Sequence, residues 1–502
     1  MATILFKKEV LEPILNAIST QADKNAFLID NCFYTYGQLG ESISCIMALL
    51  NEKQVQNQRV GLVINNDIQT YASILALWLT GKCYVPLHPQ WPLDRCLDII
   101  DQVGLSTILD SSAETRYNSD LIIATSELSS SHFPLQIAEV PESKLAYILF
   151  TSGSTGRPKG VQITRENVAA FLNSFWKTGI IVSPEDRCLQ CFDLSFDVSV
   201  QSFLVALTRG ACVYTVPYGQ AKFLSVADLI DCHKITFGAI APSTLRYLQP
   251  YFSELDFSDF RQCIITAEAG QMDLVQDWLK YASNTRVYDF YGPTEGTVYA
   301  TSYSIKNDGT DKTYNGIISI GKPLANVQAF ILDENGHILK SGEKGELCIS
   351  GSQVTPGYWA DEEKNRDAFS FLEVDGVSVR IYHTGDLCYR DKDGDILYSG
   401  RIDNQAKIQG FRVELSEIEF HSRKFLQGTN VVCVAFKNEL KLDEIALIVE
   451  SNEFDTVELI SYLRTKMPHY MIPSRFCFMS SLPINANGKI DRKRIQSQLN
   501  KS

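Results

Sequence analysis

The segment Thr151–Gly160, TSGSTGRPKG, combines the residue types that bind phosphate groups. Glycines let backbone N–H groups approach phosphate oxygens, hydroxyl side chains add donors, and a lysine adds positive charge. The candidate ligands are Thr151, Ser152, Gly153, Ser154, Thr155, Gly156 and Lys159. We therefore predict that this segment is a polyphosphate-binding loop.

Two other interpretations of the segment fit less well. A Walker A loop requires G-x-x-x-x-G-K-[ST], whereas Lys159 is followed by Gly160 and Val161. A Ser/Gly linker would be flexible and flanked by unstructured sequence, but an apolar run precedes this segment and a helical pattern follows it. The phosphate loop remains the better interpretation.

The elements on either side of the loop are those that position such a site. The run LAYILF from Leu145 predicts a buried strand, and Thr164 with Asn167 predicts the start of an amphipathic helix. Similar short apolar runs alternate with helical segments through most of the chain. This alternation predicts an α/β fold built in layers.

Charge and hydropathy exclude several classes of protein. The 502 residues include 46 Lys and Arg against 59 Asp and Glu, a formal net charge of -13. Such a surface repels nucleic acid and anionic membranes. The apolar runs are too short to cross a bilayer, and the N-terminus lacks the pattern of a signal peptide. We expect a cytoplasmic protein with neither nucleic acid nor membrane as a partner.

The thirteen cysteines show no repeating spacing, which favours reduced thiols over a disulfide framework. Cys188 and Cys191 form a C-x-x-C pair, but no second pair completes a zinc site. We interpret both as packed side chains in a buried strand.

The character of the sequence changes after Asp393. A polar stretch is followed by helical and strand patterns that fit a small α+β unit of about a hundred residues, within the usual size of a domain. The boundary is expected near Arg401–Gln405.

Several ordered motifs resemble those of the adenylate-forming superfamily, which includes acyl-CoA synthetases, luciferases and the adenylation domains of nonribosomal peptide synthetases. They are TSGSTGRPKGV at Thr151, FDLSFDVSV at Phe192, YGPTE at Tyr291, GELCISG at Gly345, TGDL at Thr384, GRIDNQAKIQGFRVELSEIE at Gly400 and NGKIDRKR at Asn487. The resemblance implies a large multi-subdomain N-terminal domain, residues 1–402, that binds ATP and an amino acid. It also implies a small mobile C-terminal lid, residues 403–502.

The resemblance also implies the reaction and its residues. ATP and a carboxylate form an acyl-adenylate with release of pyrophosphate, and a thiol then attacks it; Mg²⁺ is the expected cofactor. Glu295 is the expected Mg²⁺ ligand, Thr294 contacts the α-phosphate and Tyr291 lies against adenine. Asp386, Tyr398 and Arg401 are the further expected nucleotide contacts. Lys489 is the expected catalytic lysine and Asp403 the hinge.

The motif FDLSFDVSV resembles amino-acid-activating members at Asp197, the position of the carboxylate that binds the substrate ammonium group. A buried carboxylate is costly without a cation, so an aspartate there favours an amine over fatty or aryl acids. Motif alignment adds a pocket of Val198, Gln201, Ile240, Ile265, Ala267, Phe290, Val298 and Tyr299. For any one of these, ordinary core packing is the alternative.

The pocket pattern resembles that of proline-selecting peptide synthetases, with departures at Ile240, Phe290 and Tyr299. L-Proline is therefore the leading hypothesis, and a methylated proline or another small amino acid stays open. We expect transfer to the phosphopantetheine thiol of a separate carrier protein. The alternatives are a D-alanine:carrier-protein ligase, an acyl-CoA ligase, and a non-catalytic nucleotide-binding relative, which Lys489, Glu295 and Asp386 disfavour.

Overall fold

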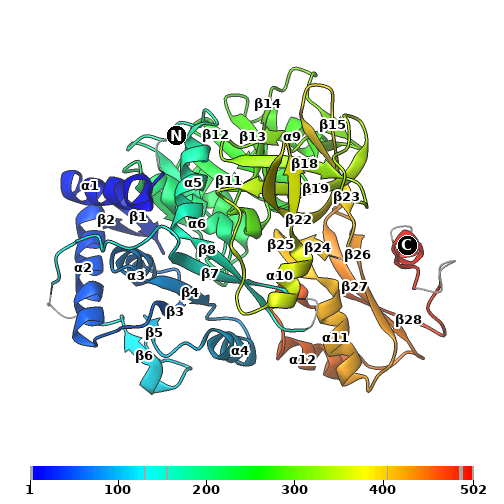
Figure 1. The fold of residues 1–502 in the computed structure, drawn as a ribbon, viewed down its shortest axis with the longest axis horizontal. Coiled ribbons are helices and arrows are strands. Elements are labelled where there is room, and N and C mark those ends of the chain that lie inside the picture. The colour runs from blue at the N-terminus through cyan, green and yellow to red at the C-terminus, as the bar shows by residue number, and fades with distance from the viewer. Residues whose placement is uncertain (1–3, 129–131, 154–155, 404, 485–489, 500–502) are drawn as a thin grey trace. The chain divides into compact units, whose positions relative to one another are not determined.

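The computed structural model describes residues 4–128, 132–153, 156–403, 405–484 and 490–499 (Figure 1). The chain divides into two compact units. The first comprises Met1–Pro89, Val103–Leu149 and Gly160–Gly400. The second comprises Arg401–Ser502 together with two short internal segments, Gln90–Gln102 and Phe150–Lys159.

A mixed sheet whose central strands run parallel forms the largest layer of the first unit. Its order is β17-β14-β13-β12-β11-β9-β10-β1-β2. In that order the strands are Lys322–Pro323, Thr301–Ile305, Arg286–Tyr291, Gln262–Ile265, Phe237–Ile240, Arg187–Gln190, Cys212–Thr215, Asn25–Ile29 and Cys32–Thr35. Strands β10, β11 and β12 are buried along their whole length. Parallel strands covered on both faces have this unbroken apolar character.

A second sheet has the order β20-β8-β7-β4-β3-β5-β6. Its strands are Gly357–Tyr358, Lys159–Thr164, Leu145–Thr151, Cys83–Leu87, Arg59–Val63, Ile108–Asp110 and Ile122–Ala124. The predicted strand at Leu145 is thus confirmed as β7. Strand β20 pairs with β8 in antiparallel register, Tyr358 opposite Val161. This pairing brings a late segment of the chain onto the sheet edge.

A third, antiparallel sheet follows in the chain, with the order β18-β19-β22-β21 and with β23 beside β22. Its strands are Val327–Leu332, Lys344–Gly351, Val377–Arg390, Phe369–Val374 and Ile396–Arg401. A small hairpin of β15 (Thr313–Tyr314) and β16 (Ile317–Ile318) precedes this sheet in the sequence.

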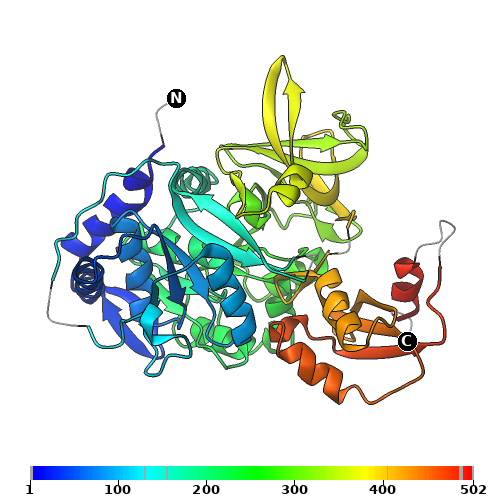
Figure 2. The same ribbon diagram turned by 60° about the horizontal axis from the view of Figure 1, so that its bottom comes forward.

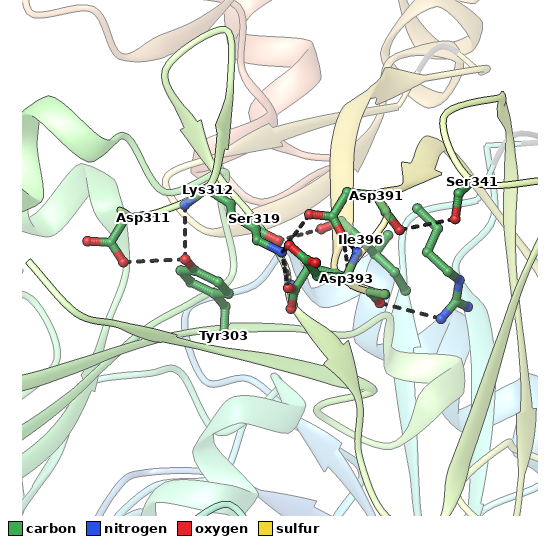
Figure 3. A network of polar contacts seen from close by, with 12 residues as sticks. Tyr303, Asp311, Lys312, Ser319, Ser341, Asp391, Asp393 and Ile396 are labelled. Atoms are coloured by element: carbon green, nitrogen blue, oxygen red, sulfur yellow. Dashed lines mark hydrogen bonds and ion pairs between the residues drawn. The ribbon is translucent and has the colours of Figure 1, made fainter. Parts of the chain in front are cut away.

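Lys312, just before that hairpin, ties it to the turn between β22 and β23 (Figure 3). Its ammonium group lies 2.6 Å from Asp391 Oδ2, 2.9 Å from Asp393 Oδ2 and 2.6 Å from Asp395 Oδ2. These hydrogen bonds raise the pKa of Lys312. One lysine thus offsets one of the three negative charges that converge here.

Helices of the first unit surround the sheets, and α2 and α3 lie against each other (Figures 1 and 2). The helix after the phosphate loop is confirmed, because Thr164 and Asn167 form a reciprocal capping box at the start of α5. The helices are η1 (Lys7–Leu11), α1 (Glu12–Thr20), α2 (Tyr36–Glu52), α3 (Ile68–Leu79), α4 (Leu93–Val103, which extends from the second unit), η2 (Ser119–Leu121), α5 (Arg165–Trp176), α6 (Asp197–Leu207), α7 (Lys222–Asp231), α8 (Pro242–Leu248), η3 (Gln249–Tyr251), α9 (Met272–Leu279), η4 (Thr294–Gly296) and α10 (Glu362–Ala368).

The second unit has its own apolar core, centred on residues such as Val413, Ile418 and Leu447. Its strands are β24 (Gln405–Ile408), β25 (Phe411–Glu414), β26 (Val431–Lys437), β27 (Asp443–Glu450) and β28 (Arg475–Met479). Its helices are α11 (Leu415–Phe425), α12 (Val457–Arg464), η5 (His469–Met471) and α13 (Arg492–Leu499). The helical and strand patterns expected after the polar stretch are therefore present.

All thirteen cysteines are free, as expected for reduced thiols. Among the described residues, no helix is both long and apolar enough to cross a membrane.

Candidate functional site

Asp197 is a buried carboxylate at the start of α6, with 6% of the residue exposed. Burial raises its pKa to about 7; hydrogen bonds from Thr294 and the Val198 N–H oppose that shift, and the charge of Glu295 adds to it. Within the described part of the chain, no lysine, arginine or histidine forms an ion pair with Asp197. This carboxylate is therefore suited to a cationic ligand.

Thr294 and Glu295 lie in η4, just after β13, and so the structure brings both close to Asp197. Glu295 is fully buried, and its Oε1 accepts a hydrogen bond of 2.7 Å from the hydroxyl of Tyr358 on β20. The backbone carbonyl of Glu295 accepts another, of 2.8 Å, from the Thr355 N–H. Neither partner could be predicted from the sequence, because the pairing of β20 with β8 carries no local sequence signal.

The segment after η4 has an unusual backbone. Thr297 and Val298 have φ of 56° and 68°, in the left-handed region that β-branched residues rarely adopt. Gln353 holds the segment in place: its side-chain Nε2 donates to Tyr299 O at 2.7 Å, and its backbone carbonyl accepts from Thr297 Oγ1. Such strain persists where the surroundings enforce it, as at ligand-binding sites.

Gly292 makes that backbone path possible. A Cβ at this position would lie 2.3 Å from Val298 O and 2.7 Å from Tyr299 Cα. Only glycine allows the two backbone segments to come this close. Gly292 belongs to the YGPTE motif, but its steric role was not foreseen from the sequence.

Two aromatic rings form one part of the predicted amino-acid pocket. Phe290 and Tyr299 meet edge to face, with centroids 5.0 Å apart, and both are buried. The Tyr299 hydroxyl donates to Gln201 Oε1 at 3.2 Å. The Nε2 of Gln201 is buried, and among the described residues it has no hydrogen-bond partner. Such a donor is suited to a ligand or water oxygen.

The remaining predicted pocket residues lie on neighbouring elements. Ile240 and Ile265 end β11 and β12 and are opposite each other in the parallel register. Helix α6, which carries Val198 and Gln201, packs against β9, β10 and β11. Ala267 follows β12 with φ of 69°. Carboxyl ends of parallel strands are a common place for ligand sites in α/β folds.

Two tyrosines near Asp197 were not foreseen. Burial raises the pKa of Tyr84 and of Tyr147, and the charge of Asp197 contributes to both shifts. The Tyr147 hydroxyl is buried and has no hydrogen-bond partner among the described residues. Tyr84 lies on β4 and Tyr147 on β7.

The predicted nucleotide residues of the first unit also meet. Tyr291, at the end of β13, donates a hydrogen bond from its hydroxyl to Oδ2 of Asp386 on β22. The backbone N–H of Asp386 donates to Thr384 Oγ1 at 3.1 Å, and Thr384 in turn donates to Leu347 O at 2.7 Å. Tyr291 thus holds the Asp386 carboxylate, and Thr384 holds the Asp386 backbone. Tyr398 is half-buried on β23.

The phosphate loop belongs to the second unit, where its polar groups contact residues of that unit. Ser152 Oγ donates to Arg412 O at 2.9 Å and accepts from Glu414 N at 2.9 Å. The Gly153 N–H donates to Glu417 Oε2 at 3.0 Å. A carboxylate oxygen therefore occupies the anion position offered by this N–H group.

Three further residues of the loop, Lys159, Gly156 and Thr151, lie close to neighbours or are buried. Lys159 is buried, 3.9 Å from Glu414 Oε1. Gly156 lies so close to Phe420 that a Cβ would be 2.4 Å from the ring. The Thr151 hydroxyl is buried without a hydrogen-bond partner in the described chain, which suits a ligand oxygen. Ser154, Thr155 and Lys489 lie outside the described residues.

Arg401 and Asp403, also in the second unit, form a two-pronged ion pair. Arg401 Nη2 lies 2.6 Å from Asp403 Oδ2, and Arg401 Nε lies 2.7 Å from Oδ1. Burial alone would raise the pKa of Asp403, but Arg401 outweighs it and lowers that pKa. The guanidinium group expected to contact the nucleotide is therefore held by the predicted hinge residue.

The chain is similar to known proteins over most of its length. Residues 15–359 match the family model of AMP-binding enzymes. Gramicidin S synthase 1 of Brevibacillus brevis is 30% identical over 95% of this chain, which spans only 43% of that synthase.

Solved structures show the same fold. The Vibrio cholerae adenylation domain AlmE, in complex with glycyl-adenosine-5'-phosphate, has a TM-score of 0.86 at 24% identity and matches 98% of each chain. An artificially fused adenylation–PCP di-domain, NpsA-ThdA from Klebsiella oxytoca, has a TM-score of 0.83 at 23% identity and matches 94% of this chain and 93% of its own. The chain belongs to the family of AMP-binding enzymes.

Proposed function

We propose that the chain activates an amino acid with ATP and transfers it to the phosphopantetheine thiol of a carrier protein. The observation that carries the proposal is Asp197, a buried carboxylate with no basic partner among the described side chains. An α-ammonium group would neutralise this carboxylate and so lower the free-energy cost of burying its charge, which a neutral ligand would not do. A fatty or aryl acid would leave this charge uncompensated.

The proposed chemistry has two steps. The substrate carboxylate oxygen attacks the α-phosphorus of ATP, the bond to the β-phosphate breaks, and aminoacyl-AMP and pyrophosphate result. A thiol sulfur then attacks the acyl carbon, giving a thioester and AMP. Positioning and charge neutralisation supply most of the rate in such displacements.

Glu295 is the residue proposed to hold Mg²⁺. It is a fully buried carboxylate whose charge acts on a second one, Asp197. Two carboxylates in one buried site call for positive charge, and a hard cation with oxygen ligands meets that need beside the substrate ammonium. When bound, Mg²⁺ would neutralise phosphate charge, while Tyr358 orients the Glu295 carboxylate.

The other roles follow the family resemblance. Thr294 would contact the α-phosphate, Tyr291 the adenine, and Asp386 with Tyr398 the ribose. Arg401, which is paired with Asp403 in this structure, would contact ribose or phosphate. Lys489 is proposed to neutralise charge that develops during adenylation. Among the proposed phosphate ligands that the structure describes, the buried Thr151 hydroxyl has no hydrogen-bond partner and could bind a phosphate oxygen.

We propose L-proline as the substrate. Support comes from a pocket whose uncharged lining includes Ile240, Ile265 and Phe290, all buried. A small apolar ring fits such a lining, whereas a charged side chain would lack a partner. ATP–pyrophosphate exchange measured with all common amino acids, D-alanine and methylated prolines tests the proposal. Strongest exchange with proline is expected; a clear preference for D-alanine, alanine or serine would refute it.

The proposed acceptor is a carrier protein on a separate chain. Support comes from the similarity to an adenylation domain that was fused artificially to a PCP. Mass spectrometry of a holo carrier incubated with the enzyme, ATP and proline should show one added prolyl group. Formation of prolyl-CoA alone, with the carrier unmodified, would refute this acceptor.

Asp403 is proposed as the pivot between the two half-reactions. It lies next to the boundary of the two units, which falls between Gly400 and Arg401. Proline fixes φ and removes a backbone donor, so Asp403→Pro would restrict rotation here. Thioester formation should fall while pyrophosphate exchange persists. Equal loss of both activities would argue against a hinge role.

A further inference from the structure

Three metal-binding side chains converge on the third sheet of the first unit. Glu346 and Cys348 lie two residues apart on β19, a spacing that puts both on one face of the strand. His383 on β22 is directly opposite Cys348 in the antiparallel register. We propose that Glu346, Cys348 and His383 form a binding site for Zn²⁺ or a similar transition metal.

The distances between the donor atoms already approach those of a zinc site. His383 Nδ1 lies 3.4 Å from Cys348 Sγ and 2.9 Å from Glu346 Oε2, and all three ligand atoms lie within 4.8 Å of one another. In a tetrahedral Zn²⁺ site the corresponding edges are about 3.3–3.6 Å, from bond lengths near 2.0 Å for nitrogen and oxygen and 2.3 Å for sulfur. Small side-chain shifts would therefore suffice to admit the metal.

Neighbouring groups fix the orientation of two of the donors. His383 Nε2 lies 2.7 Å from Ser370 Oγ on β21, an arrangement that leaves Nδ1 facing Cys348 and Glu346. Glu346 Oε1 accepts a hydrogen bond of 2.9 Å from the Gly385 N–H, which leaves Oε2 for the cluster. Metal-binding histidines and carboxylates usually have such supporting hydrogen bonds.

Charge and ligand chemistry select the class of metal. One thiolate and one carboxylate together balance the charge of a divalent ion, with the imidazole neutral. Sulfur and imidazole donors favour Zn²⁺ and exclude Mg²⁺, which prefers oxygen ligands. Cys348 is buried, while the side chains of His383 and Glu346 are 28% and 24% exposed, which gives the ion a route from solvent.

The test is zinc binding by the whole chain, which is independent of adenylation. Protein stripped with a chelator is titrated with Zn²⁺ in competition with a chromophoric chelator, with millimolar Mg²⁺ present throughout. We expect each chain to bind one equivalent of Zn²⁺ tightly. Substitution by Co²⁺ should give a thiolate-to-cobalt charge-transfer band in the near ultraviolet.

Matched variants separate a metal site from a purely hydrogen-bonded cluster. Cys348→Ser, His383→Gln and Glu346→Gln should each abolish the tight equivalent, and Ser370→Ala should weaken it by about 10–100-fold. Cys388→Ser is the control, since Cys388 is a buried cysteine on β22 outside the cluster. Circular dichroism verifies that each variant is folded. If Cys348→Ser is unstable, His383→Gln and Glu346→Gln, at partly exposed positions, still test the site. Zinc binding by the parent chain no stronger than by His383→Gln and Glu346→Gln would overturn the proposal.

Discussion

The hydroxyl of Tyr358 donates a hydrogen bond of 2.7 Å to Glu295 Oε1, across 63 positions of sequence. This bond connects the edge strand β20 to η4 and holds a fully buried carboxylate in one orientation. If Glu295 binds Mg²⁺, the orientation of its carboxylate sets the affinity for the metal.

Tyr358→Phe should therefore raise the Mg²⁺ concentration that gives half-maximal pyrophosphate exchange. A hydrogen bond to a charged group contributes about 1.5–3 kcal/mol, which corresponds to at least about a tenfold shift. The rate at saturating Mg²⁺ should change little. A lower rate with an unchanged Mg²⁺ requirement would contradict the proposed link between Tyr358 and the metal.

Asp197 should make the free protein less stable as the pH rises. Burial raises its pKa from 3.8 to about 7, so the folded state holds the proton longer than the unfolded state does. The contribution of Asp197 to the free energy of unfolding is complete below about pH 4. It falls by up to about 4 kcal/mol as the pH rises to about 7. Asp197→Asn should remove this loss, so the variant is more stable than the parent at pH 8 and similar at pH 4 in urea unfolding.

Asp193→Asn is the control, four residues away, at a half-buried carboxylate whose side chain is 16% exposed. Burial would raise the pKa of Asp193, but His88, 2.6 Å away, together with Ser195 lowers it to about 2. Its stabilising contribution is therefore present above about pH 4 and is lost as the pH falls toward 2. Asp193→Asn should destabilise the protein at neutral pH, opposite in sign to Asp197→Asn. The same sign for both variants would contradict the assignment.

The pH dependence of substrate binding follows from the same group. An ammonium ligand needs ionised Asp197, and the pKa of that carboxyl is about 7 in the free protein. The KM for the amino acid should therefore fall steeply as the pH rises from 6 to about 7 and level off toward pH 8. A KM that is constant over this range would show that Asp197 does not bind the ammonium group.

Gly292→Ala should distort the segment that carries Val298 and Tyr299. The new Cβ would lie 2.3 Å from Val298 O, so the backbone would have to move. Pyrophosphate exchange should fall by at least about tenfold, and stability by about 1–3 kcal/mol, as for other overpacked sites. Gly309→Ala is the control. Alanine at this position would be strained, because φ is 80°, but the added Cβ would meet no neighbouring atom within 4 Å. It should cost about 1 kcal/mol or less and leave exchange unchanged.

Arg95→Met should destabilise the second unit strongly. Arg95 Nη1 lies 2.7 Å from Glu417 Oε1, and both side chains are almost completely buried. Loss of one partner from a buried pair costs about 3–5 kcal/mol, because the other charge stays buried. The double variant Arg95→Met/Glu417→Gln should recover much of that loss in chemical unfolding. Lys24→Met, which breaks an exposed pair with Glu185, should cost less than about 1 kcal/mol.

The local features of the fold were predictable from the sequence. The strand at Leu145 and the helix after Thr164 each have a signal within a few residues, an apolar run or a capping box. Reduced cysteines followed from their spacing. Such features depend on short-range chemistry, which a single sequence records directly.

The long-range partners could not be predicted in the same way. Tyr358 reaches Glu295 through the pairing of an edge strand, and Arg95 reaches Glu417 across 322 positions. His383, for which the sequence offered no account, gains its partners Cys348 and Ser370 only from the register of the third sheet. Register depends on how distant strands pair, and no local pattern specifies it for these residues.

Asp197 is proposed to select a substrate with an amine next to the carboxylate. The most direct test compares pyrophosphate exchange with proline and with cyclopentanecarboxylate, which has the same ring but no nitrogen. Exchange with proline and almost none with cyclopentanecarboxylate is expected for the parent chain, and Asp197→Ala should lose the proline activity. Comparable exchange with the two acids, or full proline activity in Asp197→Ala, would contradict the account.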